Sequence, residues 1–327
     1  MNHRAISLLI TLSLISIGCL LLALYAGSLS ISWPEIISSF YVEQKTMAQQ
    51  LVLELRLPRA AAAFITGGLL ALSGALMQVL LRNPLADPYV LGISGGAAVA
   101  ALIAILTGLS GLALSGSAFV GALCAMLLVF GLSHGQGSWT PTRLLLTGIV
   151  LASGWGAMIS FLLAISPDQN LRSMLFWLMG DLGYAETIGP SVIVLIAGLL
   201  ISISVARNLN ILSQGELQAA SLGVKTNQLR LLIYILASLM TATAVTLAGS
   251  IGFIGLVIPH LIRLMGFSDN RILLPASALM GGSMLILADT LSRTIIAPQQ
   301  LPVGVISAAI GVPMFLFLLY RGQVHRL

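Results

Sequence analysis

The side chains best suited to chemistry in this sequence are three arginines near the ends of apolar runs. Arg56 and Arg59 flank Pro58 one helical turn apart, so they project from nearly the same face of a helix. Arg293 closes another apolar run. Guanidinium groups match carboxylates in geometry and charge, which predicts a basic rim that binds acidic residues of a soluble partner. The alternative is that these side chains only extend to lipid phosphates.

Groups that could carry covalent or ion-coupled chemistry are scarce. Asp289 is the clearest ionisable residue inside an apolar run, and its place four residues before Arg293 predicts an ion pair along one helix. Ion-coupled carriers usually hold acids or histidines near the membrane midplane, and a membrane enzyme needs a polar cluster at one depth. We therefore expect no secondary transporter, no enzyme, no metal site and no cofactor bound by this chain. The histidines are scattered: His3, His134, His260 and His325.

The composition requires a membrane. Of the 327 residues, 58% are hydrophobic and only 8% are charged, whereas a soluble domain carries about 25% charge. Only two lysines occur, and the sequence contains no G-x-x-x-x-G-K-[ST] loop, so it has no recognisable nucleotide site. We expect a single all-α transmembrane domain over residues 1–327, surrounded by lipid and without a role in binding nucleic acid.

Ten apolar runs are candidates for a bilayer span, which needs about 20 residues, although the eighth, 256–266, is short and interrupted by glycine and proline. With the N-terminus in the cytoplasm, ten of the 15 basic residues fall inside, which agrees with the usual bias of lysine and arginine. The first run is longer than the core of a signal peptide, so we expect an uncleaved helix there. The longest polar connections are an outer loop at 28–53 and an inner loop at 207–229. The runs are 5–26, 54–81, 93–109, 112–132, 143–165, 189–206, 229–250, 256–266, 272–292 and 303–320.

One segment, 83–98, interrupts the apolar pattern with two prolines, an acid and three glycines. Irregular backbone at membrane depth is tolerated only where protein or a water-lined cavity satisfies it, so the break indicates either part of a pathway or a simple cytoplasmic turn. A second Gly/Pro break occurs at 249–259, and paired breaks in two inverted halves are typical of transporters. The glycines of 92–96 and 148–156 would let helices approach closely.

The inner loop contains a segment with the signals of a short helix. Ser213 and Glu216 have the spacing of a capping box, and Gly223 is placed to end the helix. Leu217 and Leu222 are then available to pack. The helix either rests on its own domain or inserts into a cytosolic partner, and both interpretations fit the segment by itself.

Five motifs in order resemble one known family. The chain is similar to the FecCD family of type II ABC importer permeases, which carry iron–siderophores, haem or vitamin B12, over about residues 5 to 321. The resemblance implies ten transmembrane helices per subunit and a homodimer or pseudo-dimer with its pathway on the two-fold axis. It also implies two cytosolic ATPase subunits, which bind ATP and Mg, and one periplasmic binding protein. The motifs are Arg56-Leu-Pro-Arg59, the run at 83–98, Gly252-Phe-Ile-Gly-Leu-Val-Ile-Pro-His260, Ala288-Asp289 and Leu301-Pro-Val-Gly304.

The resemblance also implies two docking surfaces. Arg56, Arg59 and Arg293 match the outer arginines that meet acidic residues on the two lobes of the binding protein. The segment 213–224 matches the coupling helices that dock on the ATPase. Its expected coupling residues are Ser213, Gly215, Glu216, Leu217, Ala220, Leu222 and Gly223.

The resemblance further implies a narrow cytoplasmic gate formed by Asn83, Leu85 and Thr142. Pro141 replaces a small hydroxyl residue that vitamin B12 permeases carry beside the gate, so the shape of the constriction differs there. We therefore expect a permease subunit in the bacterial inner membrane, with both termini cytoplasmic, that imports a metal chelate. The motifs are common to iron, haem and vitamin B12 members and do not choose among these cargoes.

Overall fold

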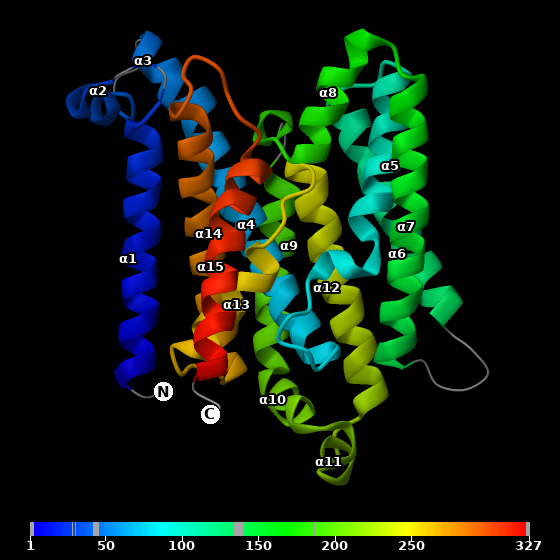
Figure 1. Cartoon of the computed structure of the whole chain (residues 1–327). Coiled ribbons are helices and arrows are strands. Elements are labelled where there is room, and N and C mark those ends of the chain that lie inside the picture. The colour runs from blue at the N-terminus through cyan, green and yellow to red at the C-terminus, as the bar shows by residue number, and fades with distance from the viewer. Residues whose placement is uncertain are drawn as a thin grey trace.

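The computed structural model of the chain is an upright bundle of helices (Figure 1). It describes residues 3–27, 29, 31–41, 46–133, 140–185 and 188–324, and within these ranges every regular element is a helix. His134, His325 and part of the outer loop at 28–53 lie outside the described residues. We call the end of the bundle with α11 (Glu216–Ser221) the inner end, and the opposite end, with α8 (Asp168–Met179), the outer end.

Six stretches of the described chain are long and apolar enough to cross a membrane. A seventh, α9 (Gly189–Ser204), continues into α10 (Ala206–Gln214) after a bend of 63°. Three further apolar helices are α5 (Ile93–Leu106), α13 (Ile254–Leu264) and α15 (Val303–Val324). The six stretches are α1 (His3–Tyr25), the continuous stretch Met47–Leu80, α6 (Gly111–Ser133), α7 (Pro141–Ile165), α12 (Thr226–Ala248) and α14 (Asn270–Thr294).

Each of the ten expected runs coincides with a helix, and the differences lie at the boundaries. The run expected at 54–81 begins earlier, because α3 (Met47–Gln49) and a π-helix, η1 (Gln50–Arg56), lead directly into α4 (Leu57–Leu80). The sequence did not predict α8, whose 12 residues are too few and too polar for a span. The remaining short elements are α2 (Trp33–Ser38), η2 (Pro88–Leu91) and η3 (Leu182–Tyr184).

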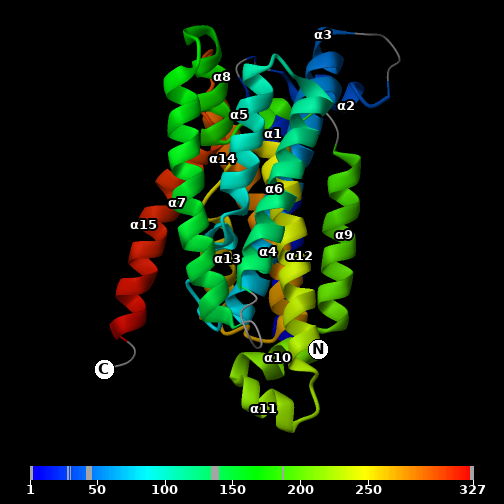
Figure 2. The same cartoon turned by 90° about the vertical axis from the view of Figure 1, so that its right-hand side faces the viewer.

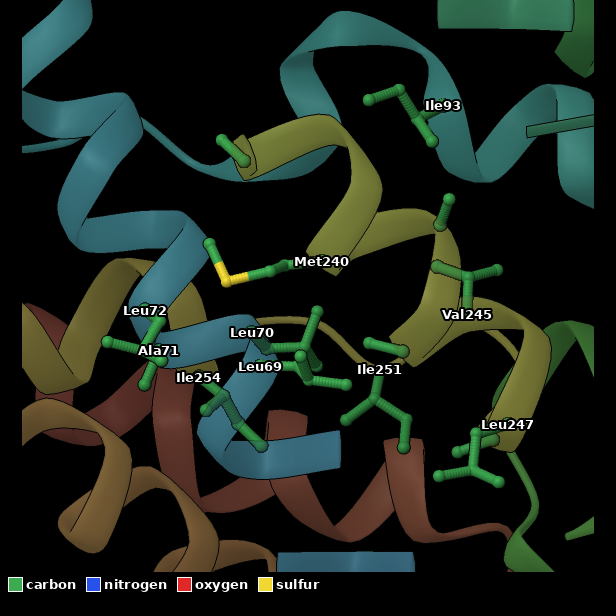
Figure 3. Close-up of a cluster of buried hydrophobic side chains, with 14 of the residues drawn as sticks. Leu69, Leu70, Ala71, Leu72, Ile93, Met240, Val245, Leu247, Ile251 and Ile254 are labelled. Carbon is green, nitrogen blue, oxygen red and sulfur yellow. The ribbon is translucent and has the colours of Figure 1, made fainter. Parts of the chain in front are cut away.

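The core is organised around α4, which is buried along nearly its whole length against α12, α13 and α14. Figure 3 shows its leucines beside Met240 of α12 and Ile254 of α13. Glycines bring the neighbouring backbones together: a Cβ on Gly67 would lie 2.2 Å from the carbonyl oxygen of Gly281 in α14. Small residues at such crossings favour close packing of helices in a membrane, where the surrounding lipid is as apolar as the side chains.

The two breaks in the apolar pattern meet inside the bundle. After α4 the chain turns at the inner end, re-enters the bundle as η2 and continues outward as α5, whereas after α12 it turns near the outer end and begins α13 (Figure 1). The hydroxyl of Tyr89 accepts a hydrogen bond from the amide of Ile251 at 3.1 Å. A Cβ on Gly255 would lie 2.7 Å from the ring of Pro88. The 83–98 break is therefore an exposed turn at its start, and from η2 onward it is part of the bundle interior.

The expectation of close approach at glycines is confirmed at some positions only. A Cβ on Gly148 of α7 would lie 2.4 Å from the carbonyl oxygen of Val90, and one on Gly95 would lie 2.7 Å from Trp155. Gly154 and Gly156, in the same predicted set, have no neighbouring atom within 4 Å of an added Cβ. The first part of the predicted glycine set therefore packs within this chain, and the last part faces open space.

Candidate docking surfaces and gate

The inner surface is built on α10, which crosses the inner end of the bundle after the bend that follows α9 (Figure 1, Figure 2). The side chain of Asn210 anchors this helix. Its Nδ2 donates to the carboxylate of Asp269 at 2.7 Å, and its Oδ1 accepts from the side-chain Nδ2 of Asn270 at 2.7 Å. Burial works to raise the pKa of Asp269, but hydrogen bonds from the Arg271 amide and from Asn210 lower that pKa below its ordinary value. The anchor fixes α10 to the first turn of α14.

Gly215 separates α10 from α11, and this changes the prediction for the segment 213–224. The predicted capping box between Ser213 and Glu216 is wrong, because Ser213 lies in the last turn of α10 and donates its hydroxyl hydrogen to the carbonyl of Asn210 at 2.7 Å. Gly215 has φ +144°, a conformation that L side chains rarely adopt, and it stops one helix and starts the next. The segment is the end of one helix and the whole of another.

The end of α11 agrees with the sequence. Gly223 has φ +80°. The amides of Gly223 and Val224 donate to the carbonyls of Ala220 and Ala219, both at 3.0 Å, which is the double bond of a left-handed helix end. At the other end, the carboxylate of Glu216 forms an ion pair with Arg230 of α12. The helix is thus held at both ends although it has fewer than two turns.

Most of α11 faces away from the chain. Ala219 is fully buried, whereas 89% of Leu217 and 63% of Leu222 are exposed, and Ala220 is exposed as well. Figure 2 shows α11 beyond the inner end of the bundle. An exposed apolar cluster on an otherwise polar connection marks a surface for another protein. We call Leu217, Ala220 and Leu222 the α11 patch.

The outer surface brings the three predicted arginines to one pocket, whose lining also includes Glu54 and Gln300. Arg59 donates to Asp289 at 2.8 Å, and Arg293 donates to the other oxygen of the same carboxylate at 3.0 Å. The predicted ion pair within α14 is therefore confirmed, and a second helix shares it. Only 1% of Asp289 is exposed, so it is a buried carboxylate held between two guanidinium groups.

Two further partners of Arg59 come from loops that the sequence did not connect to it. Gln300 accepts a hydrogen bond at 3.0 Å, and the carboxylate of Asp181, which precedes η3, lies 3.5 Å from the guanidinium. Asp181 and Arg59 are more than a hundred residues apart, so sequence spacing carries no signal for this pair. We call Arg59, Arg293, Asp289 and Asp181 the outer charge cluster.

Arg56 has a different environment from Arg59, although sequence spacing places them on one helical face. Its guanidinium donates to the carbonyls of Leu24, at 2.6 Å, and Tyr25, at 2.9 Å, and also to that of Leu29. It therefore caps the end of α1, where carbonyls lack helical partners, and only 5% of the residue is exposed. The backbone is α-helical at both Arg56 and Leu57, so the two arginines differ in the partners that surround each side chain and not in helical spacing.

The predicted gate residues lie at the inner end of the bundle. Asn83 and Leu85 are exposed in the turn that follows α4, and the side-chain oxygen of Asn83 accepts from the amide of Leu85 at 2.9 Å. Thr142 is exposed in the first turn of α7. Thr140, and not Thr142, caps that helix, because it accepts from the amide of Arg143 at 3.3 Å. Thr142 therefore does not cap the helix. Pro141 occupies the first helical position, where its missing N–H is not needed.

Comparison with known sequences relates the chain to membrane transport proteins. The sequence model of the FecCD transport family matches residues 14–321. The chain is 42% identical to the hemin transport system permease protein HmuU of Yersinia pestis, covering 84% of each chain. It is 37% identical to the vitamin B12 import system permease protein BtuC of Salmonella paratyphi A, covering 98% of this chain and 97% of that one.

Comparison with solved structures gives the same result. The fold matches that of a metal-chelate type ABC transporter in an inward-facing conformation with a TM-score of 0.85. The two chains are 32% identical, and the match covers 96% of this chain and 99% of the other.

Proposed function

This chain belongs to the FecCD transport family, and we infer from that premise how it works as the membrane-spanning permease subunit of an ABC importer. It is a multi-pass membrane protein of the inner membrane and performs no covalent chemistry itself. Members of this family work with an ATPase and with a substrate-binding protein. In the proposal, both termini are cytoplasmic, ATP and Mg bind to the ATPase, and a second copy of this chain completes the pathway.

The α11 patch is the proposed docking surface for the ATPase. The observation that carries this role is the exposure of Leu217 and Leu222 on a short helix outside the inner end of the bundle. Burial of a leucine side chain contributes about 1.5–3 kcal/mol, which a soluble partner can supply. Because Glu216 is paired with Arg230 and α10 is anchored on α14, a movement of the ATPase would be transmitted to α12 and α14.

The outer charge cluster is the proposed docking surface for the binding protein. Its arginines line one pocket, so carboxylates of a partner would meet guanidinium groups whose orientation Asp289 already fixes. Preorganised guanidinium groups bind carboxylates with less loss of side-chain freedom. In this proposal Arg59, the least buried of the three arginines, contacts the partner directly, and Arg56 and Arg293 shape the pocket, the first by holding the end of α1 and the second by holding Asp289.

The gate of Asn83, Leu85 and Thr142 would form between two copies of the chain. All three residues are exposed at the inner end, and each would occur twice around a two-fold axis. Access would alternate when the ATPase moves the α10–α11 segment. The proposed cargo is a metal chelate. The names of the relatives point to haem, vitamin B12 or another metal chelate, and the resemblance to the family adds iron–siderophores.

The test is uptake into proteoliposomes that contain the chain with its ATPase and its binding protein. One of the three chelate classes should accumulate, only with ATP and only with the binding protein present. A complex that lacks the ATPase but carries a proton or sodium gradient is the control. Uptake driven by the gradient alone would contradict the proposal and would indicate a secondary transporter.

A further inference from the structure

Pro259 leaves an unmatched carbonyl in the middle of α13. Proline has no N–H, so the carbonyl of Gly255, four residues earlier, has no partner in the helical ladder. Such a group is costly when it is buried in a membrane unless a neighbouring side chain supplies a donor. Both residues are buried, and the missing partner must therefore come from outside α13.

Gln78 of α4 supplies that donor. Its side-chain amide donates to the carbonyl of Gly255 at 3.4 Å and to that of Leu256 at 3.1 Å. Its side-chain oxygen accepts a hydrogen bond from the guanidinium of Arg263, which lies four residues after Pro259 in α13. Gln78 is only 4% exposed, so one buried side chain binds α13 on both sides of its proline.

The two helices are also in backbone contact beside this joint. A Cβ on Gly74, one turn before Gln78, would lie 1.9 Å from the carbonyl oxygen of Gly255. The contact leaves no room for water between the helices at this point. The side-chain amide of Gln78 is therefore the donor through which α4 forms hydrogen bonds with the carbonyls of Gly255 and Leu256.

The backbone of Gln78 contacts the gate. The amide of Asn83 donates to the carbonyl of Gln78 at 3.2 Å, which closes the turn after α4. Gln78, Asn83 and Arg263 line one groove at the inner end, and Ser213, in the last turn of α10, lines it too. The same residue is thus bonded to α13 through its side chain and to the gate turn through its carbonyl.

We infer that Gln78 is a positioning residue of the gate, which makes α13 and the turn at 83–87 move as one body. This inference rests on the proposed function, because it assumes that the turn is a gate. Movement of α10 would reach the groove at Ser213 and pass through Arg263 and Gln78 to Asn83. Without the amide of Gln78, α13 and the turn would shift independently.

A mutant cycle tests the contact itself. Gln78→Met keeps the length of the side chain but removes both its donors and the oxygen that accepts from Arg263, and it should lower the midpoint of thermal unfolding of the intact complex by a few degrees. Pro259→Ala restores an N–H for the carbonyl of Gly255, so it should raise that midpoint more in the Gln78→Met background than in the wild type. Pro275→Ala, the same change in α14, is the matched control: removing a helix-interior proline is itself stabilising, and its effect should be the same in both backgrounds. An effect of Pro259→Ala that is equal in the two backgrounds would overturn the inference.

Labelling tests the connection to the gate. Leu85→Cys is introduced together with Cys19→Ala and Cys124→Ser, and the rate of reaction with a membrane-impermeant maleimide is measured in inside-out vesicles. Gln78→Met should raise this rate several-fold and should lower the chelate imported per ATP hydrolysed. An unchanged rate with unchanged coupling would overturn the inference. If the wild-type complex imports no chelate, the proposed function fails, whereas the unfolding and labelling results still judge the role of Gln78.

Discussion

The two candidate docking surfaces differ in how their side chains are used within the chain. In the outer charge cluster the functional groups are occupied: Asp289 binds Arg59 and Arg293, and Asp181 lies 3.5 Å from Arg59. In the α11 patch, by contrast, 89% of Leu217 is exposed and little of the chain covers it. One surface is polar and internally paired, and the other is apolar and uncovered.

This difference predicts two kinds of association. An outer partner must compete with internal acids for the arginines, so its binding should be screened by salt and readily reversible. An inner partner gains the burial of leucine side chains, which salt does not screen. The structure thus suits a binding protein that associates transiently and an ATPase that remains bound.

Leu217→Asp should weaken assembly with the ATPase about 10- to 100-fold, because it removes an exposed leucine that docking would bury and places a charge in the proposed interface. The measurement is the affinity of the purified ATPase for the chain in nanodiscs. Gln218→Asp, at an exposed polar neighbour on α11, adds the same charge without removing an apolar side chain and should change the affinity little. Equal losses in both variants would show that charge alone matters and that the leucine is not a contact.

Gly223→Val should weaken the same affinity about tenfold, since a β-branched residue at positive φ carries a strain of about 1–3 kcal/mol and would distort the end of α11. Gly223→Asn is the matched control, because asparagine tolerates the left-handed conformation, and it should retain most of the affinity. The spans should remain inserted in both variants. If the Gly223→Val variant binds the ATPase normally and still couples ATP hydrolysis fully to transport, the shape of α11 does not control the ATPase.

Arg59→Gln should weaken docking of the binding protein about fivefold at low salt, as expected for a partly exposed charge pair, and should flatten its dependence on salt. Glutamine keeps a donor for Asp289 and so limits the damage to the fold. Arg172→Gln removes an exposed charge of the same sign from α8 and serves as the control. The docking role is contradicted if both variants respond to salt in the same way as the wild type.

Asp181→Asn should strengthen docking about two- to threefold, because Arg59 then loses an internal competitor whose partly exposed ion pair, 3.5 Å long, is worth less than about 1 kcal/mol. The measurement, for this variant and for Arg59→Gln, is the affinity of the binding protein for the chain in nanodiscs. Asp168→Asn, in the first turn of α8, removes an outer acid that is not in the cluster and should have a smaller effect. Weaker docking in Asp181→Asn would show that Asp181 supports the partner instead of competing with it.

The sequence predicted most of the fold, because a membrane-spanning helix requires a long run of apolar residues that is visible in the sequence. Each of the ten expected runs became a helix, and the i, i+4 spacing of Asp289 and Arg293 correctly indicated an ion pair. It missed α8, which is short and partly polar, and it misplaced the cap of α11, because the break at Gly215 depends on a backbone angle. Local periodicity predicts a helix but not the conformation of the glycine that ends it.

The sequence predicted that the three arginines lie near one another better than it predicted what they contact. The arginines do line one pocket, but Asp181 and the carbonyls that hold Arg56 come from distant segments. The joint of Gln78 with α13 was missed for the same reason: Gln78 and Pro259 are far apart in the chain, and no local spacing links them. Long-range partners are set by packing, which a single sequence does not display.

The salt dependence of the two affinities, measured on one reconstituted complex, tests the contrast most directly. Between about 50 mM and 500 mM NaCl the Debye length falls about threefold, so attraction between rim charges is strongly screened. The affinity for the binding protein should fall steeply over this range. The affinity for the ATPase should change by less than about twofold, because salt does not screen the burial of apolar side chains. An ATPase affinity that falls as steeply as that of the binding protein would contradict this contrast.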